Sequence, residues 1–261
     1  MTDQDRRGGS VVGGADGAKN VSVPARAYDR RRFLASLAAS GIAAVGAGCG
    51  WDGGKHIAPK LMSWSGVNDW VSARLFSGSR LAREYPLARR TPERDFPDYY
   101  VSDSMPHVPD PAAWRLQVSG MVRKPASLTL ERLQALPRLS YTVKHHCVEG
   151  WTAIATWAGV PFRAVADLVE PLPAARYVKF TSFDAGYGNG WDLPSAMHPQ
   201  TILAYAYNDR PLMPDHGAPL RLYSPTKLGY KNTKYLLAVE FTDTRPGGYW
   251  EDQGYPWFGG L

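Results

Sequence analysis

The stretch that most constrains this chain runs from Val143 to Trp151, with the sequence Val-Lys-His-His-Cys-Val-Glu-Gly-Trp. Two histidines, a thiol and a carboxylate fall within five consecutive positions there. Cys147 is the only cysteine in the globular part of the chain, because Cys49 lies in an N-terminal leader. A lone thiol cannot form an internal disulfide, so Cys147 is an inert core residue, a nucleophile or a metal ligand.

The neighbours of Cys147 bear on this choice. From composition alone, an isolated cysteine is most often a buried packing residue. Positive charge from Lys144, His145 and His146 would favour the thiolate, which attacks carbon or binds a soft metal. Zinc motifs space their ligands by two or more residues, so three adjacent ligands are not expected to form a zinc site. A hydrolase using Cys147 and a histidine stays open, although no hydrolase signature surrounds this cysteine.

Charge is distributed unevenly along the 261 residues, whose formal net charge is +6. Residues 1–60 carry nine basic and five acidic side chains, whereas residues 61–261 carry 21 and 19. The body of the chain is therefore nearly balanced, and no RNA- or DNA-binding motif is visible. We expect no nucleic-acid partner.

The leader has the pattern of a twin-arginine export signal. Arg30 and Arg31 are followed, after one residue, by Phe33 and Leu34 and then by a short run rich in Ala and Gly. That run is too short and too weakly apolar to span a membrane. We expect export to the periplasm or to the outer face of the cell membrane. The segment that ends at Cys49 faintly resembles a lipoprotein cleavage site, so a lipid anchor stays open.

Three regions are predicted: a disordered N-terminus with the export signal (1–50), an extended arm (51–95) and one domain (96–261). Alternating or buried apolar runs predict strands at 114–118, 141–143, 177–180, 202–207, 220–223 and 235–241. Helical spacing predicts helices at 128–136 and 162–169. Residues 159–161 are expected to turn, and 184–191 to form a glycine-rich loop without dinucleotide-binding spacing. Irregular strands with short helices indicate an α+β fold.

A second cluster of functional residue types lies between residues 215 and 235. His216, Arg221, Lys231 and Lys234 are four potential cations interleaved with Gly217 and Gly229. Glycine lets a ligand approach the backbone closely, and Arg and Lys pair with phosphate. Taken alone, such a run of charges is more often a solvated strand face.

The segments 145–151 and 157–161 resemble the molybdenum-ligand segment of the sulfite oxidase family of molybdopterin-dependent oxidoreductases. The resemblance is nearest to its bacterial branch around the periplasmic methionine sulfoxide reductases. The segments 215–221 and 224–235 resemble that family's pterin- and phosphate-binding segments, in the same order. The resemblance implies the family's molybdopterin-binding fold from about residue 96 to 244.

The resemblance also implies roles for individual residues. Cys147 would be the one protein ligand of the molybdenum in a molybdenum–molybdopterin cofactor, and Tyr187 would match the family's active-site tyrosine. A haem-containing membrane subunit or a cytochrome is the implied electron partner, and the substrate would be a small oxo compound such as a sulfoxide. The residues implied to bind the cofactor are His145, His146, Asp103, His216, Arg221, Gly229, Lys231 and Lys234.

The chain departs from the family pattern in one segment. Sulfite oxidases have Arg-Asn-His after two aromatic residues, where this chain has Ser102, Asp103 and Ser104. Loss of the arginine weakens recognition of a dianion, so sulfite is not the expected substrate. We therefore predict an exported molybdenum oxidoreductase that transfers an oxygen atom with two electrons. A cysteine-dependent hydrolase and a non-catalytic exported binding domain are the alternatives.

Overall fold

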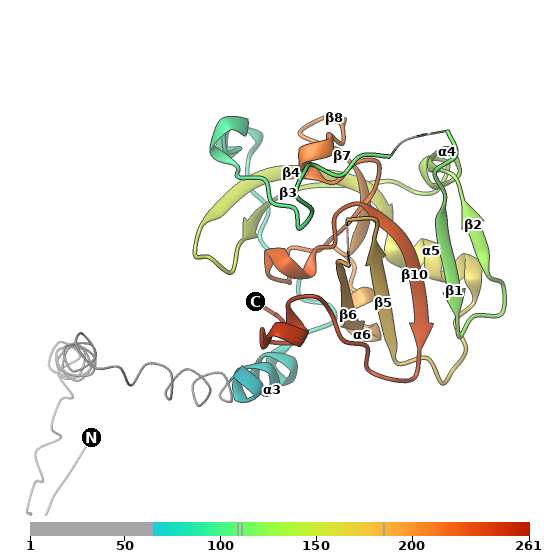
Figure 1. Cartoon of the computed structure of the whole chain (residues 1–261). Coiled ribbons are helices and arrows are strands. Elements are labelled where there is room, and N and C mark those ends of the chain that lie inside the picture. Colours follow the sequence, from blue (N-terminus) through green and yellow to red (C-terminus); the bar gives the residue numbers. More distant parts are fainter. Residues whose placement is uncertain (1–64, 109, 111, 185) are drawn as a thin grey trace, which may run out of the picture. The chain divides into compact units, whose positions relative to one another are not determined.

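The computed structural model describes residues 65–261 except 109, 111 and 185 (Figure 1). The chain divides into the units Met1–Gly54 and Lys55–Leu261, and every described residue belongs to the second. The predicted export signal and Cys49 lie outside the described residues. Within the described part, no helix is long and apolar enough to cross a bilayer.

The first sheet has five strands in the order β2-β1-β10-β5-β6 (Figure 1). Strand β1 runs parallel to β10, and the other neighbours are antiparallel. Leu116 and Val118 of β1 are buried and Gln117 between them is exposed, as the alternating pattern predicts for a half-buried strand. The strands are β1 (Leu116–Gly120), β2 (Ala126–Leu128), β5 (Tyr177–Ser182), β6 (Gly188–Asp192) and β10 (Leu236–Thr242).

The second sheet is antiparallel, in the order β3-β4-β7-β8, with β9 also paired to β7. Strand β4 is almost wholly buried, and its register to β7 shifts between Ala158 and Gly159. At Gly159 a Cβ atom would lie 2.0 Å from the Leu203 carbonyl oxygen, so only glycine fits this close strand approach. The strands are β3 (Leu139–His146), β4 (Thr152–Pro161), β7 (Ile202–Tyr207), β8 (Arg210–Pro211) and β9 (Arg221–Tyr223).

Short helices complete the fold. Helix α4 (Leu130–Gln134) begins after Thr129, which caps it: the Thr129 hydroxyl accepts a hydrogen bond from the Arg132 amide. Helix α5 (Phe162–Val169) buries one face in the larger hydrophobic core, which also takes side chains from both sheets. Helix α6 (Leu193–Ala196) begins at the capping residue Asp192. Mixed sheets with few short helices confirm the predicted α+β class.

One local prediction was wrong and a second was right only in part. Residues 159–161 are not a turn but the end of β4, and residues 188–191, half of the glycine-rich stretch 184–191, belong to strand β6 rather than to a loop. In both places glycine allows close backbone packing: at Gly190 a Cβ would lie 2.5 Å from the Pro246 carbonyl oxygen. Glycine therefore marks tight contacts here, and not the ends of elements.

The segment that precedes the domain lies along its surface. It contains helix α3 (Ser65–Leu75), which the sequence did not predict, and the short 3₁₀ helices η1 (Leu87–Arg89) and η2 (Glu93–Asp95). The Phe76 ring packs against Phe258, and the Tyr85 amide donates a hydrogen bond to the Thr142 carbonyl at 2.8 Å. The backbone of this segment thus adds to the edge of β3, in the manner of an extra strand.

Candidate active site

A cavity of about 340 Å³ lies where the end of β3, the segment after β9 and the C-terminal segment meet. Phe96 on its lining belongs to the smaller core cluster around Trp157, and Trp151 packs on that cluster, so this part of the cavity rests on a packed support. The residues that line it are Phe96, Pro97, Tyr99, Tyr100, Val101, His145, Cys147, Val148, Glu149, Trp151, Asp184, Tyr187, His216, Arg221, Gly229, Tyr230, Asn232, Lys234, Trp250 and Tyr255.

Cys147 lies in the loop that joins β3 to β4. The Cys147 amide donates to the Trp151 carbonyl at 3.0 Å, and Gly150 adopts a φ of 92°, which favours glycine. The thiol is partly buried on the cavity lining, with its sulfur 3.8 Å from a carboxylate oxygen of Glu149. Burial, helped by the charge of Glu149, raises the pKa of the Cys147 thiol. A raised pKa does not suit a cysteine nucleophile of a hydrolase, which needs an activated thiolate.

Glu149 is held by the aromatic residues beside Cys147. The Trp151 indole N–H donates to its carboxylate at 3.2 Å, and a hydrogen bond from Tyr99 lowers the pKa of Glu149. The Tyr99 and Trp151 rings stack with centroids 6.3 Å apart. The carboxylate thus has a defined position within reach of the sulfur atom.

His145 is buried at the end of β3, between the ring of Tyr223 and that of Phe96. Burial, together with the positive charge of Arg221, lowers the pKa of His145 to about 3, so its imidazole is neutral. At Gly229 a Cβ atom would lie 2.8 Å from the His145 Nε2 atom. Glycine at 229 therefore allows the backbone of η4 (Gly229–Lys231) to pass directly over the imidazole.

Arg221 and His216 lie together on the inner side of the cavity. The Arg221 side chain is buried, donates to the backbone carbonyls of His216 (3.0 Å) and Asn232 (3.1 Å), and places its guanidinium 4.7 Å from the centre of the Trp157 ring. Within the part of the chain that the structure describes, the Arg221 Nε and His216 Nε2 atoms have no hydrogen-bond partner. Burial and the nearby guanidinium lower the pKa of His216 to about 4. Buried donors without partners are costly unless a ligand satisfies them.

Lys234 is the second cation at the cavity. Its ammonium donates to the Tyr99 carbonyl at 2.8 Å and to the Asp215 carbonyl at 2.6 Å. Burial and the charge of Arg221 lower the pKa of Lys234 to about 7. Among the described residues, neither Lys234 nor Arg221 forms an ion pair with a carboxylate. A buried arginine and a half-buried lysine, neither with a carboxylate partner among the described residues, are suited to hold an anionic group such as a phosphate.

Tyr187 lines the cavity from the connection between β5 and β6, directly before the first residue of β6. Its hydroxyl donates to the Tyr230 carbonyl at 2.5 Å, and the Asn189 amide donates to the same carbonyl at 2.9 Å. Burial raises the pKa of Tyr187, so the phenol stays protonated. These two hydrogen bonds connect the β5–β6 hairpin to the η4 segment.

The structure brings seven of the predicted site residues together on the cavity: His145, Cys147, Tyr187, His216, Arg221, Gly229 and Lys234. Three others do not line it. Asp103 is exposed, His146 points partly away at the end of β3, and Lys231 is fully buried with its ammonium bonded to Glu251 and to the Gly190 carbonyl. Adjacent residues of a strand face opposite sides, so His145 and His146 cannot both face the cavity.

Some lining residues had no recognisable signal in the sequence. Asp184 accepts hydrogen bonds from the amides of Val101 (2.7 Å) and Ser102 (2.8 Å), and so fixes the segment in which Ser102 replaces the family's arginine. Trp250 and Tyr255 reach the cavity from the far end of the chain. Only the fold, and no local motif, brings these side chains to Cys147.

The residues present fit the pterin cofactor that the resemblance implies. The cavity offers one soft sulfur donor, the unpartnered Nε atoms of Arg221 and His216, and a close approach at Gly229. A thiolate suits a redox transition metal, and buried cations suit a phosphate. The chemistry of the donor set, with one thiol and several cations, thus matches a metal–dithiolene group that carries a phosphate.

Comparisons with known proteins agree with this chemistry. Residues 104–250 match the model of the "Oxidoreductase molybdopterin binding domain" family. A protein of Azospira oryzae named "Putative protein-methionine-sulfoxide reductase subunit YedZ1" is 41% identical over 94% of this chain and 91% of its own length. The protein-methionine-sulfoxide reductase catalytic subunit MsrP of Xanthomonas campestris is 32% identical over 86% of this chain and 73% of its own.

One solved structure supports the fold. The sulfane dehydrogenase SoxCD of Paracoccus pantotrophus superposes with a TM-score of 0.51 at 22% sequence identity, covering 54% of this chain and 41% of that one. At this identity the likeness concerns the fold alone. Together with the family match and the chemistry of the cavity, these findings show that the chain belongs to the family of oxidoreductases with a molybdopterin-binding domain, enzymes that use a molybdenum–molybdopterin cofactor.

Proposed function

We propose that this protein is an exported reductase of sulfoxides, including methionine sulfoxide in proteins. The observation that carries the proposal is the position of the Cys147 thiol on the lining of the cavity. The same lining contains Arg221 and Lys234, which form no ion pair with a carboxylate among the described residues, and the exposed aromatic residues Tyr99 and Tyr100. Relatives that align along most of the chain are named as protein-methionine-sulfoxide reductase subunits.

The cavity opening favours a neutral dipolar substrate over a dianion. Where sulfite oxidases have an arginine, Ser102 donates from its hydroxyl to Asp184 at 2.5 Å. Glu149 adds a second carboxylate beside Cys147. Two negative groups at the lining repel sulfite, whereas the aromatic rings Tyr99, Trp151 and Trp250 accommodate an apolar thioether side chain.

Each group has a defined part in this proposal. Cys147 would hold the molybdenum through its sulfur, and Arg221 and Lys234 would pair with the pterin phosphate. When bound, the molybdenum–pterin group supplies the two-electron redox chemistry. The net reaction takes a sulfoxide, two electrons and two protons to a thioether and water. Glu149, hydrogen-bonded to Trp151 and near the sulfur, is placed to accept a hydrogen bond at the cavity as a carboxylate.

The electrons come from another protein in this proposal. The chain has only two cysteines, too few for an iron–sulfur cluster held by four thiolates. We infer that a haem-containing membrane subunit or a cytochrome reduces the enzyme, outside the cytoplasm. The paired Arg30 and Arg31 in the leader support export by the twin-arginine route, which moves proteins after they have folded.

The function is tested with protein from a host that makes the pterin cofactor. Wild-type protein should contain molybdenum and pterin, and should reduce dimethyl sulfoxide and methionine sulfoxide with a reduced dye as electron donor. Cys147→Ser should lose molybdenum and activity while keeping the same circular dichroism spectrum, because only one ligand changes. Wild-type protein without molybdenum, or turnover of sulfite in preference to sulfoxides, would refute the proposal.

Export is tested separately. Replacing Arg30 and Arg31 together by Lys should keep the folded protein in the cytoplasm, as cell fractionation would show. Continued export of that variant would contradict the twin-arginine route without touching the catalytic proposal.

A further inference from the structure

The C-terminal segment, residues 245–261, forms one side of the cavity although it follows the last strand of the domain. It passes over β6, where the Tyr249 amide donates to the Gly188 carbonyl at 3.0 Å. It then places Trp250 and Tyr255 on the cavity lining, with their rings 5.1 Å apart. No regular element longer than the 3₁₀ helix η5 (Glu251–Gln253) holds this segment.

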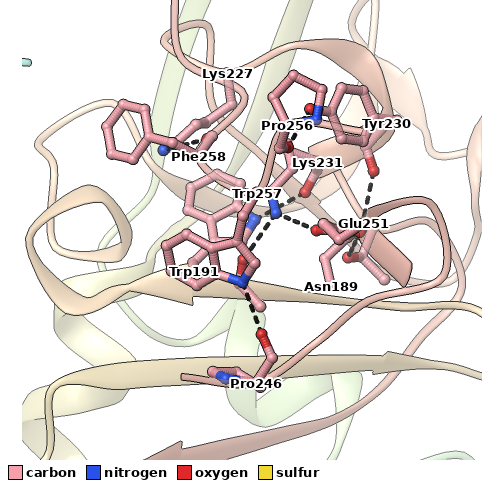
Figure 2. Close-up of polar contacts among 12 residues, drawn as sticks. Asn189, Trp191, Lys227, Tyr230, Lys231, Pro246, Glu251, Pro256, Trp257 and Phe258 are labelled. Atoms are coloured by element: carbon pink, nitrogen blue, oxygen red, sulfur yellow. Dashed lines mark hydrogen bonds and ion pairs between the residues drawn. The ribbon is translucent and has the colours of Figure 1, made fainter. Parts of the chain in front are cut away.

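Buried side chains of the domain hold the segment in place (Figure 2). The Lys231 ammonium forms an ion pair with Glu251 and donates to the Gly190 carbonyl at 2.8 Å, and both side chains of the pair are at most 3% exposed. The Tyr230 hydroxyl donates to the Pro256 carbonyl at 2.6 Å, and Lys227 donates to the Phe258 carbonyl at 2.7 Å. These three contacts to the C-terminal segment come from one stretch, 227–231, which also lines the cavity at Gly229 and Tyr230.

The path of the segment is specified by local sequence as well. At Gly248 a Cβ atom would lie 2.3 Å from the Glu251 Oε2 atom, so a larger residue would displace the carboxylate from Lys231. The Trp257 indole N–H donates to the Pro246 carbonyl at 2.7 Å and closes the segment on itself. A buried ion pair adds little net stability but defines which geometry is allowed, because either charge alone would be buried without a partner.

Aromatic and apolar groups surround the cavity opening next to this segment. Tyr99 is 53% exposed, Tyr100 40% and Val148 41%, and they line the cavity together with Trp250 and Tyr255. Exposed Tyr and Trp side chains are the residues that most often carry binding energy in protein and peptide recognition. A substrate as small as dimethyl sulfoxide needs only the inner cavity, whereas a polypeptide must also contact this rim.

We propose that Trp250 and Tyr255 form a recognition surface for the polypeptide around a sulfoxide side chain, and that Lys231 and Glu251 are the residues that position them. This inference rests on the proposed sulfoxide reductase function. The ion pair touches neither substrate nor cofactor. It acts by holding Trp250, the residue next to Glu251, against the cavity.

The main test compares Glu251→Gln with Asp252→Asn, a matched neutralisation of the exposed neighbouring carboxylate. Steady-state kinetics are measured with dimethyl sulfoxide and with a peptide that contains methionine sulfoxide. For Glu251→Gln and for Trp250→Ala we expect the KM for the peptide to rise about tenfold relative to the KM for dimethyl sulfoxide, as for loss of one aromatic contact. Asp252→Asn should leave this ratio unchanged. Equal KM changes for both substrates in Glu251→Gln and Trp250→Ala would overturn the proposal.

Positioning by the ion pair has its own readout. Chymotrypsin should cleave the holoenzyme after Tyr249 or Trp250 faster in Glu251→Gln than in wild type or Asp252→Asn, because the segment is released. Unchanged cleavage would show that Lys231 and Glu251 do not hold the segment. Molybdenum content distinguishes failure of the proposed function from failure of the recognition surface. If wild-type protein lacks the metal, the proposed function is wrong. If the variants contain the metal and their ratio of peptide KM to dimethyl sulfoxide KM is unchanged, only the recognition surface is rejected.

Discussion

Two groups of buried or half-buried cations lie close together in sequence but have opposite surroundings. Lys227 and Lys231 are paired with Asp192 and Glu251 and hold the C-terminal segment. Arg221 and Lys234 have only carbonyl and aromatic neighbours among the described residues, and they face the cavity. A buried charge is tolerated when it is paired, so an unpaired one indicates that its counter-charge comes from a ligand.

This difference divides cations that serve the fold from cations that serve the cofactor. Lys231 and Lys234 are three residues apart, and both were predicted to bind the pterin. The structure gives Lys231 an internal carboxylate partner and leaves Lys234 on the cavity lining. The comparison can be tested by removing charges from one group at a time.

The largest expected effect is on cofactor content. Exchanging Arg221 and Lys234 together for Ala removes two charge-assisted contacts to the phosphate and should weaken pterin binding by about a hundredfold or more. Purified protein should contain little pterin and yet unfold cooperatively. Lys227→Met is the control, because its ammonium bonds to the C-terminal segment instead. Full pterin content in the double variant would show that Arg221 and Lys234 do not bind the cofactor, and so would contradict the division into structural and cofactor-binding cations.

The second effect is on stability. Lys231→Met leaves the Glu251 carboxylate buried without its partner and should lower the free energy of unfolding by about 3–5 kcal/mol. Lys234→Met in cofactor-free protein removes a cation that lacks a carboxylate, so the change should stay within about 1 kcal/mol. Urea unfolding measures both. Similar losses in the two variants would mean that the ion pair is not the reason for the difference.

A third effect concerns pH. Burial lowers the pKa of Lys227 to about 7 in the folded protein, against about 10.5 when unfolded. Between these values the unfolded chain binds more protons, so this lysine makes stability rise as pH increases from about 7 to 10. Lys227→Met should flatten that rise by roughly 1–3 kcal/mol. Unfolding curves at a series of pH values test this, and parallel profiles for the two proteins would contradict it.

The smallest effect is expected from Tyr230→Phe. The change removes the hydroxyl that donates to the Pro256 carbonyl and should cost about 1 kcal/mol of stability. It leaves the Lys231–Glu251 pair intact, so cleavage of the C-terminal segment by chymotrypsin should rise less than in Glu251→Gln. A larger rise than in Glu251→Gln would make the hydroxyl, and not the ion pair, the main contact that holds the segment.

The amino-acid sequence by itself determined the family, the α+β class, most strands, and the thiol with its cation-rich partner segment. These features are local: the alternation along β1 and the Cys147 segment each depend on residues a few positions apart. The export signal and the electron partner are predictions from the sequence that lie beyond the described residues.

Tertiary structure alone decided which members of each motif face the cavity. Burial and pairing depend on what packs from elsewhere, so no local pattern could show that Lys231 meets Glu251 or that Asp184 holds Ser102. For the same reason the glycines at 159 and 190 were mistaken for turn and loop residues, when each accommodates a neighbouring backbone. Partners distant in sequence set the electrostatic environment of a side chain, and that environment separates a ligand-binding cation from a structural one.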